Sequence, residues 1–119
     1  MILVDTSVWI DHLRRGDEHL SELLVETRAV THPLVIGELA CGHLKRRTEV
    51  LGLLESLPSA PVAADEEVLF FVDRHGIAGE GIGYVDACLL AATALGDGLR
   101  LWTRDKRLRA VAERLGLAW

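Results

Sequence analysis

Four acidic residues of this chain stand in or beside apolar sequence, where acids are uncommon: Asp5, Glu38, Asp86 and Asp105. Asp5 and Asp105 follow strand-like apolar stretches. Asp86 begins the apolar segment 84–95, and Glu38 interrupts another apolar segment. Most of the other acids stand among polar residues, as solvated surfaces require. If the four carboxylates converge, their oxygens are the ligands that Mg²⁺ and Mn²⁺ prefer.

Repulsion between the acids decides what such a cluster means. Two carboxylates about 5 Å apart repel each other by roughly 3 kcal/mol at an effective dielectric constant near 20. Three or four of them would cancel a good part of the ~5–15 kcal/mol that stabilises a domain. Either some of the acids hold protons or a cation neutralises them. No histidine or cysteine stands at a chelating spacing, so Mg²⁺ or Mn²⁺ is favoured over zinc.

Two apolar strands are expected to position these acids. The run 1–4 is continuous and apolar, as in a strand buried on both faces of a parallel sheet, and 99–103 is a second such strand. In a parallel sheet the strand ends and the starts of the following helices share one edge. We therefore expect Asp5, Asp86 and Asp105 to meet at that edge.

Strands alternate with helices along the rest of the chain. The patterns predict helices over 8–15, 18–27, 34–44, 48–57, 65–74, 84–95 and 106–115, with short strands at 28–31, 61–64 and 117–119. This order predicts an α/β fold, a three-layer α/β/α sandwich with a mainly parallel sheet of four or five strands. The glycine-rich stretch 75–83 is expected to be a mobile loop beside the site.

Composition limits the function classes. The 119 residues are half apolar, with a mean hydropathy of +0.23, which predicts one folded domain, 1–119. No apolar run reaches the roughly 18 residues of a membrane span and no signal peptide is recognisable, so a cytoplasmic location is expected. The net charge of −5 disfavours a general polyanion-binding surface but not a metal-dependent nuclease with local basic clusters. Both cysteines, Cys41 and Cys88, are expected to be buried thiols.

Each acid also has a purely structural interpretation. Asp5 and Asp105 could cap the helices that follow them, and Asp86 could be a first-turn acid favoured by the helix dipole. Glu38 could pair with a core arginine. The coincidence of all four favours a functional site.

The motifs together resemble the PIN domain, and most closely the VapC-type ribonuclease toxins. The resemblance covers the whole chain and rests on Met1-Ile-Leu-Val-Asp5-Thr-Ser, Glu38-Leu, Asp86-Ala-Cys-Leu-Leu-Ala and Leu101-Trp-Thr103-Arg-Asp105. It implies a metal-dependent endoribonuclease that acts on RNA with Mg²⁺ or Mn²⁺. It places Asp5, Glu38, Asp86 and Asp105 at the acidic positions and Thr103 at the Ser/Thr position of the family. It further implies a cognate antitoxin and a homodimer.

The resulting hypothesis assigns a role to each residue. Asp5 and Asp86 hold the ion, while Glu38 and Asp105 complete the site directly or through water. Thr103 orients Asp105 or a water, although a β-branched residue in a strand is an equal interpretation. Arg104, Lys106 and the cluster 45–47 are candidates to steer RNA. Apolar residues near Trp9, Leu13 and Leu44 either face a partner or belong to the core.

Other functions are less well supported. The main alternative is an inactive PIN-like scaffold. A phosphotransfer enzyme with Asp5 as the covalent acceptor would require a second aspartate where Ser7 stands. The five histidines show no paired spacing, which disfavours metal-free general acid–base cleavage of RNA.

Overall fold

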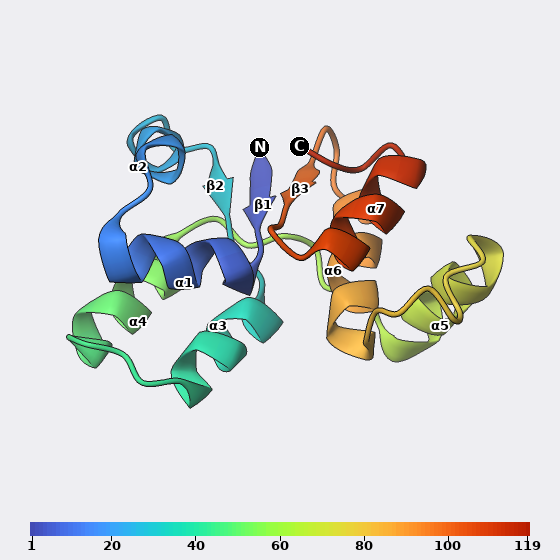
Figure 1. Ribbon diagram of the computed structural model, residues 1–119, viewed down its shortest axis with the longest axis horizontal. Helices are drawn as coiled ribbons and strands as arrows, with labels where there is room; N and C mark the ends of the chain where they lie inside the picture. The colour runs from blue at the N-terminus through green and yellow to red at the C-terminus, as the bar shows by residue number, and fades with distance from the viewer.

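The computed structural model, which describes residues 1–119, contains seven helices and three strands (Figure 1). In chain order they are β1 (Ile2–Val4), α1 (Thr6–Arg15), α2 (Glu18–Val25), β2 (Ala29–Val30), α3 (Pro33–Cys41), α4 (Arg47–Ser56), α5 (Asp65–Arg74), α6 (Tyr84–Leu95), β3 (Arg100–Trp102) and α7 (Lys106–Arg114).

The strands form a parallel sheet in the order β2-β1-β3. Strand β1 lies at its centre, where Leu3 pairs with Val30 on one side and with Leu101 on the other. Leu3 and Val4 are completely buried, as expected for a strand covered on both faces. The predicted α/β fold with a parallel sheet is confirmed.

The sheet is smaller than the four or five strands expected. The segment 61–64 forms no strand, and the chain instead touches β2 through one parallel bridge between Thr31 and Ser59. Pro61 has no N–H group with which to extend this pairing. At the other edge the chain end makes one bridge, between Leu101 and Ala118, so no full edge strand forms there.

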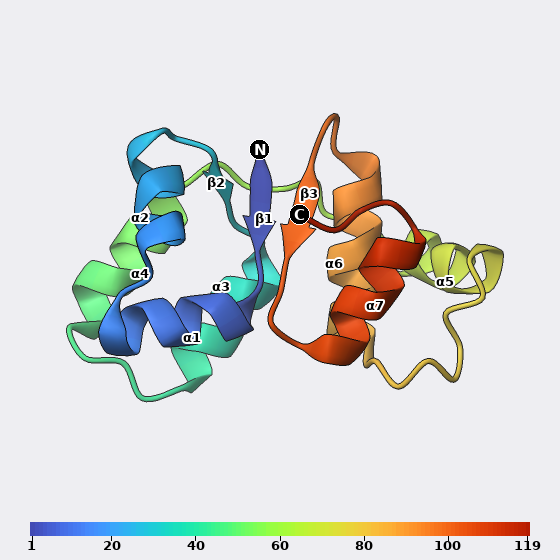
Figure 2. The same ribbon diagram turned by 45° about the horizontal axis from the view of Figure 1, so that its top comes forward.

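The helices form two groups around the sheet. Figures 1 and 2 show α1 to α4 on the β2 side of the sheet, with α1 and α3 reaching beneath β1 in both views, and α5 to α7 on the β3 side. Helix α1 packs against α3, α3 against α4, and α6 against both α5 and β3. One core cluster of 23 buried residues joins the sheet to helices from both groups. Trp9, only 1% exposed, belongs to this core rather than to a partner surface.

Helix α6 is buried on nearly every side, as its apolar sequence predicted. Every residue from Ala87 to Thr93 is buried, and the Thr93 hydroxyl is satisfied by donating to the Leu89 carbonyl at 2.7 Å. Cys88 is buried in this helix, but the expectation of a buried Cys41 was wrong. Helix α3 ends at Cys41 rather than at residue 44, which leaves this side chain exposed at the helix end. No helix combines the length and the apolar character needed to cross a membrane.

Candidate active site

Asp5 is held by side chains rather than used as a helix cap. It is only 6% exposed and occupies the N-cap position of α1, yet its carboxylate accepts no bond from the backbone of that helix. Its Oδ2 atom instead accepts hydrogen bonds from the hydroxyls of Ser7 and Thr103, each at 2.7 Å. Its backbone N–H donates to the Trp102 carbonyl at 2.9 Å. The pairing of β1 with β3 therefore fixes this acid at the sheet edge.

Thr103 links two of the predicted acids. It is buried, its hydroxyl donates to Asp5, and its Oγ1 atom accepts the backbone N–H of Asp105 at 3.1 Å. Ser7 has a similar arrangement, since its hydroxyl donates to Asp5 and its oxygen accepts the backbone N–H of Arg104 at 3.0 Å. From the sequence, Ser7 was considered only as the residue that stands where a phosphotransfer enzyme would need a second aspartate, and it was assigned no role in the site. Its position two residues after Asp5 was the available signal.

Asp86 lies half-buried in the first turn of α6. Burial raises the pKa of its carboxyl group, and the charge of Asp5 raises that pKa further. A backbone hydrogen bond from Gly83 lowers the pKa of Asp86, whereas Asp105 and Glu38 each raise it. The other three predicted acids therefore all act electrostatically on Asp86. Asp5, Asp86 and Asp105 stand at the end of β1 and at the starts of α6 and α7, which are the positions that a parallel sheet brings to one edge.

Glu38 and Asp105 are exposed and anchored at the border of this neighbourhood. Glu38 has no arginine partner, and its Oε1 atom accepts the Thr6 hydroxyl at 2.7 Å. Asp105 does cap α7, because its Oδ1 atom accepts the backbone N–H groups of Arg107 and Leu108 at 2.9 and 3.0 Å. The capping interpretation of Asp105 is therefore correct, but it accounts for one oxygen only.

Three of the acids share one pattern of hydrogen bonding, in which a single carboxylate oxygen is held by the protein. Asp5 uses Oδ2, Glu38 uses Oε1 and Asp105 uses Oδ1 for hydrogen bonds within the protein. The second oxygen of each carboxylate makes no side-chain or capping hydrogen bond and stays available. Rigid anchoring of one oxygen with the other left free is a suitable arrangement for binding a cation.

The donor chemistry fits Mg²⁺ or Mn²⁺. All of the acids offer oxygen, and because burial and the neighbouring carboxylates raise the pKa of Asp86, a cation beside it would favour its ionised form. No three Asp, Glu, His or Cys side chains gather closely enough to hold one ion together. A compact cage of four carboxylates is thus not formed. Mg²⁺ does not require one, since one or two carboxylates with water and phosphate oxygens suffice.

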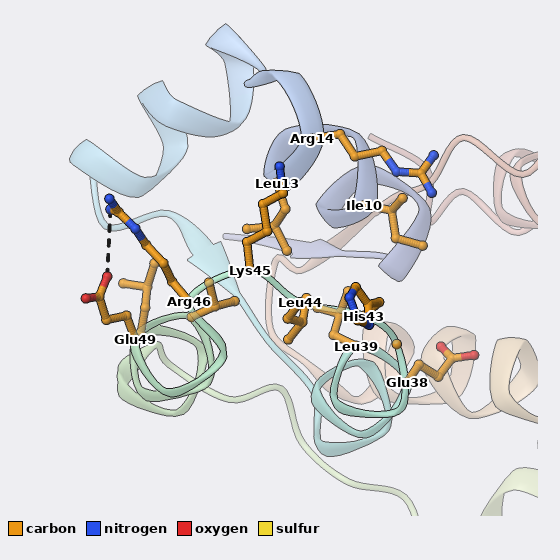
Figure 3. A pocket seen from close by; sticks show the side chains of 13 residues that line it. Ile10, Leu13, Arg14, Glu38, Leu39, His43, Leu44, Lys45, Arg46 and Glu49 are labelled. Carbon is orange, nitrogen blue, oxygen red and sulfur yellow. Dashed lines mark ion pairs between the residues drawn. The ribbon is translucent and has the colours of Figure 1, made fainter.

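A groove opens beside Glu38 between α1, α3 and α4. Its volume is about 800 Å³, and Figure 3 shows its lining side chains. Leu13 and Leu44 line it, in contrast to the buried Trp9. Arg14, Lys45 and Arg46 lie around it, with Arg46 paired to Glu49 at 3.9 Å. The groove is therefore apolar within and mainly basic around its border.

The basic residues beside the site differ in their partners. Arg104 is paired with both Asp11 and Asp17, so its charge is already neutralised. Lys106 makes no ion pair and lies with Arg107 along a smaller cleft beside α7. The suggestion that Arg104 steers RNA is therefore not supported by its surroundings, whereas Lys106 stays a candidate.

Comparison with known proteins gives a consistent result. The family model of the PIN domain matches residues 2–114. Ribonuclease VapC32 of Mycobacterium tuberculosis is 55% identical over 118 residues, covering 99% of this chain and 95% of the relative. Ribonuclease VapC11 of the same species is 30% identical, covering 94% of this chain and 92% of the relative. The crystal structure of PAE2754 from Pyrobaculum aerophilum superposes with a TM-score of 0.65 at 18% identity, covering 96% of this chain and 90% of that protein, a likeness of fold.

Proposed function

The chain belongs to the PIN domain family and is of the VapC type, and from this membership we propose that it is a Mg²⁺- or Mn²⁺-dependent endoribonuclease, the toxin of a toxin–antitoxin pair. The reaction is hydrolysis of an RNA phosphodiester bond. Water adds to phosphorus, the bond to the leaving oxygen breaks, and that oxygen gains a proton. When bound, the divalent ion supplies Lewis acidity that activates water and stabilises charge on the phosphate.

The proposal assigns the ion to Asp5 and Asp86, with Glu38 and Asp105 acting through water. Ser7 and Thr103 orient Asp5, because their hydroxyls occupy Oδ2 and leave Oδ1 free. Asp86 gains most from a nearby cation, since burial and three neighbouring charges disfavour its ionised form. This assignment uses each carboxylate in the orientation that its anchoring bonds leave open.

The observation that supports this proposal most strongly is a buried Asp5, oriented by Ser7 and Thr103 at the end of β1, whose charge raises the pKa of Asp86 in the first turn of α6. The test is cleavage of total RNA with Mg²⁺ or Mn²⁺, compared with the same reaction in EDTA. Asp5→Asn should lose the metal-dependent cleavage and keep the fold. Asp97→Asn is the matched control, because Asp97 is exposed in the turn before β3 and makes no ion pair.

Three outcomes separate the proposal from its alternative. Cleavage that stops with EDTA and in Asp5→Asn supports the ribonuclease. Mn²⁺ binding by calorimetry without any RNA cleavage would favour a PIN-like scaffold. Equal cleavage by the wild type and Asp5→Asn would reject the assigned site.

We further propose a protein antitoxin as the partner and the cytoplasm as the location. The groove beside Glu38 suits an amphipathic helix with acidic residues, because its interior is apolar and Arg14 and Lys45 lie unpaired at its border. An antitoxin bound there would lie next to Glu38 and therefore next to the site.

A homodimer is also part of the proposal. Helices α5 and α6 expose large apolar side chains, among them Leu69 at 58%, Phe70 at 68% and Leu95 at 53%. Phe70, Phe71 and Leu95 also line a cleft of about 440 Å³ between these helices. A projecting ring next to an apolar cleft on the same surface is the self-complementarity that a two-fold contact needs.

A further inference from the structure

Arg104 stands between two residues of the proposed site, Thr103 and Asp105, yet its side chain points to other elements. One guanidinium nitrogen donates to Asp11 of α1 and the other to Asp17, the N-cap of α2. The guanidinium carbon lies 5.7 Å from the centre of the Trp102 ring. Through this side chain, the three-residue connection from β3 to α7 contacts helix α1 and the N-cap of α2.

We propose that Arg104 is a positioning residue, whose side chain braces the segment Thr103–Asp105 against α1 and α2 and thereby aligns Asp5 and Asp105. The proposal rests on the proposed ribonuclease activity. Arg104 itself touches no reacting atom, and it acts through the backbone of its neighbours.

The route from Arg104 to Asp5 is short. The backbone N–H of Arg104 donates to the Ser7 oxygen at 3.0 Å, and the Ser7 hydroxyl donates to Asp5 at 2.7 Å. The residue before it, Thr103, donates to the same Asp5 oxygen. The residue after it, Asp105, is held by its own N–H to Thr103. A displaced Arg104 backbone would therefore disturb both hydroxyls that orient Asp5.

The chemistry of the brace requires arginine. A planar guanidinium presents two donor edges in a fixed geometry, so it can bridge two carboxylates that come from different elements. A lysine ammonium is a single point charge and cannot hold both in that way. The two acids are mostly covered, with side chains 25% and 15% exposed for Asp11 and Asp17. This covering gives the pairs more weight than ion pairs fully in solvent.

A contact between Arg104 and RNA phosphate is the competing interpretation. Arg104 carries one positive charge, while Asp11 and Asp17 together carry two negative charges, so the group as a whole is not cationic. A phosphate would have to displace a carboxylate to reach the guanidinium. The bracing role, in contrast, requires only the contacts with Asp11 and Asp17 that the structure contains.

The test compares Arg104→Ala and Arg104→Lys with wild type. We expect kcat to fall about tenfold with KM for RNA changed less than about twofold, because misplacement lowers the rate rather than substrate affinity. Arg104→Lys should not restore kcat. Arg109→Ala is the matched control: Arg109 lies on α7, pairs with Glu113 at 2.8 Å and should leave kcat unchanged.

A second measurement does not depend on cleavage. Exchange of the backbone amide hydrogens at positions 104 and 105 should be about tenfold faster in Arg104→Ala, because this segment loses the contacts with Asp11 and Asp17. If Arg104→Ala does not fold, Asp11→Ala removes one of the two carboxylates that Arg104 contacts and should show the same two effects to a smaller degree.

The outcomes distinguish this proposal from the proposed function. A raised KM with unchanged kcat and a weaker salt dependence of binding, measured in an Asp5→Asn background, would show a phosphate contact and overturn the brace. Unchanged kcat and unchanged exchange would also overturn it. If wild type cleaves no RNA, the proposed function fails, and the exchange rates alone still decide whether Arg104 braces the loop.

Discussion

The Thr103 hydroxyl donates to Asp5 across 98 positions of sequence at a distance of 2.7 Å. This bond joins the ends of β1 and β3, and the same threonine oxygen accepts the Asp105 backbone N–H at 3.1 Å. One buried side chain thus holds the two acids that follow the paired strands. The stability of the fold and the orientation of Asp5 both depend on this side chain.

Replacing Thr103 with valine removes the hydroxyl at nearly constant volume. It leaves the Asp105 N–H without its acceptor and Asp5 with one donor, which should lower the free energy of unfolding by about 1–3 kcal/mol. RNA cleavage should fall about tenfold, because Asp5 loses orientation. Urea unfolding and kcat/KM are the measurements. Thr103→Ser should stay near wild type, and Thr93→Val, at a buried threonine within α6, should keep full activity.

Asp86→Asn should stabilise the protein in the absence of metal. The pKa of Asp86 is raised in the folded state, chiefly by burial and then by Asp5. As pH rises, the unfolded chain therefore ionises first, and the ionisation of Asp86 lowers the free energy of unfolding at neutral pH. We expect the variant to melt a few degrees higher in EDTA, the shift that about 1 kcal/mol produces in a domain of this size.

Bound metal should reverse the order of the melting temperatures of the wild type and Asp86→Asn. Mn²⁺ should raise the melting temperature of the wild type, because it binds the folded state, and should have little effect on Asp86→Asn. Thermal melts with EDTA and with Mn²⁺ check both statements. A variant that melts below wild type in EDTA, or that gains as much from Mn²⁺, would contradict the assignment of Asp86.

Lowering the pH should weaken the ion pairs of Arg104 with Asp11 and Asp17. The pKa of Asp11 is lowered, first by its hydrogen bond from Arg104, and the pKa of Asp17 is lowered, first by the Leu20 backbone N–H and also by Arg104. Their contribution to stability is complete above the ordinary carboxyl pKa of 3.8 and is lost as pH falls through the lower folded values.

Arg104→Gln should therefore flatten the acid limb of a plot of unfolding free energy against pH, and should leave its shape above pH 6 unchanged. Arg109→Gln serves as the control. An unchanged acid limb in Arg104→Gln would show that these pairs add nothing to stability.

A substitution in the groove should affect binding of the proposed antitoxin without affecting the acidic site. Leu13 lines the groove and belongs to none of the hydrogen bonds that hold the acids, so Leu13→Lys should weaken neutralisation by the proposed antitoxin by about tenfold or more and leave RNA cleavage unchanged. Inhibition of cleavage by purified antitoxin gives the measurement. Val25→Lys, at an exposed apolar position on α2, is the control. Equal inhibition of wild type and Leu13→Lys would exclude this groove as the antitoxin site.

The apolar face of α5 and α6 should hold the homodimer. Phe70 is 68% exposed in the single chain, and Phe70→Ser should shift the molar mass from dimer to monomer in light scattering without lowering helix content. Val25→Ser removes a more exposed apolar residue, 85% exposed on α2, and should leave the dimer intact. A Phe70→Ser protein that stays dimeric would place the contact on another surface.

Local sequence determined much of this protein. The unbroken apolar run before Asp5 and the mainly apolar stretch before Arg104 predicted β1 and β3, because short apolar runs of this length are typical of strands buried in a parallel sheet. The uniformly apolar stretch of α6 predicted its central place in the same way. Since parallel strands end at one edge, the neighbourhood of Asp5, Asp86 and Asp105 followed from the element order alone.

Tertiary structure decided the properties that depend on residues far apart in the chain. The partner of Asp5 is Thr103 because β1 and β3 pair in one register, and no local pattern contains that register. Arg104 looks like a free cation in the sequence and is neutralised in the fold, because helix α1 and the N-cap of α2 bring Asp11 and Asp17 to it. Local apolarity sets which segments are buried. Hydrogen-bond and charge partners are set only when those segments pack.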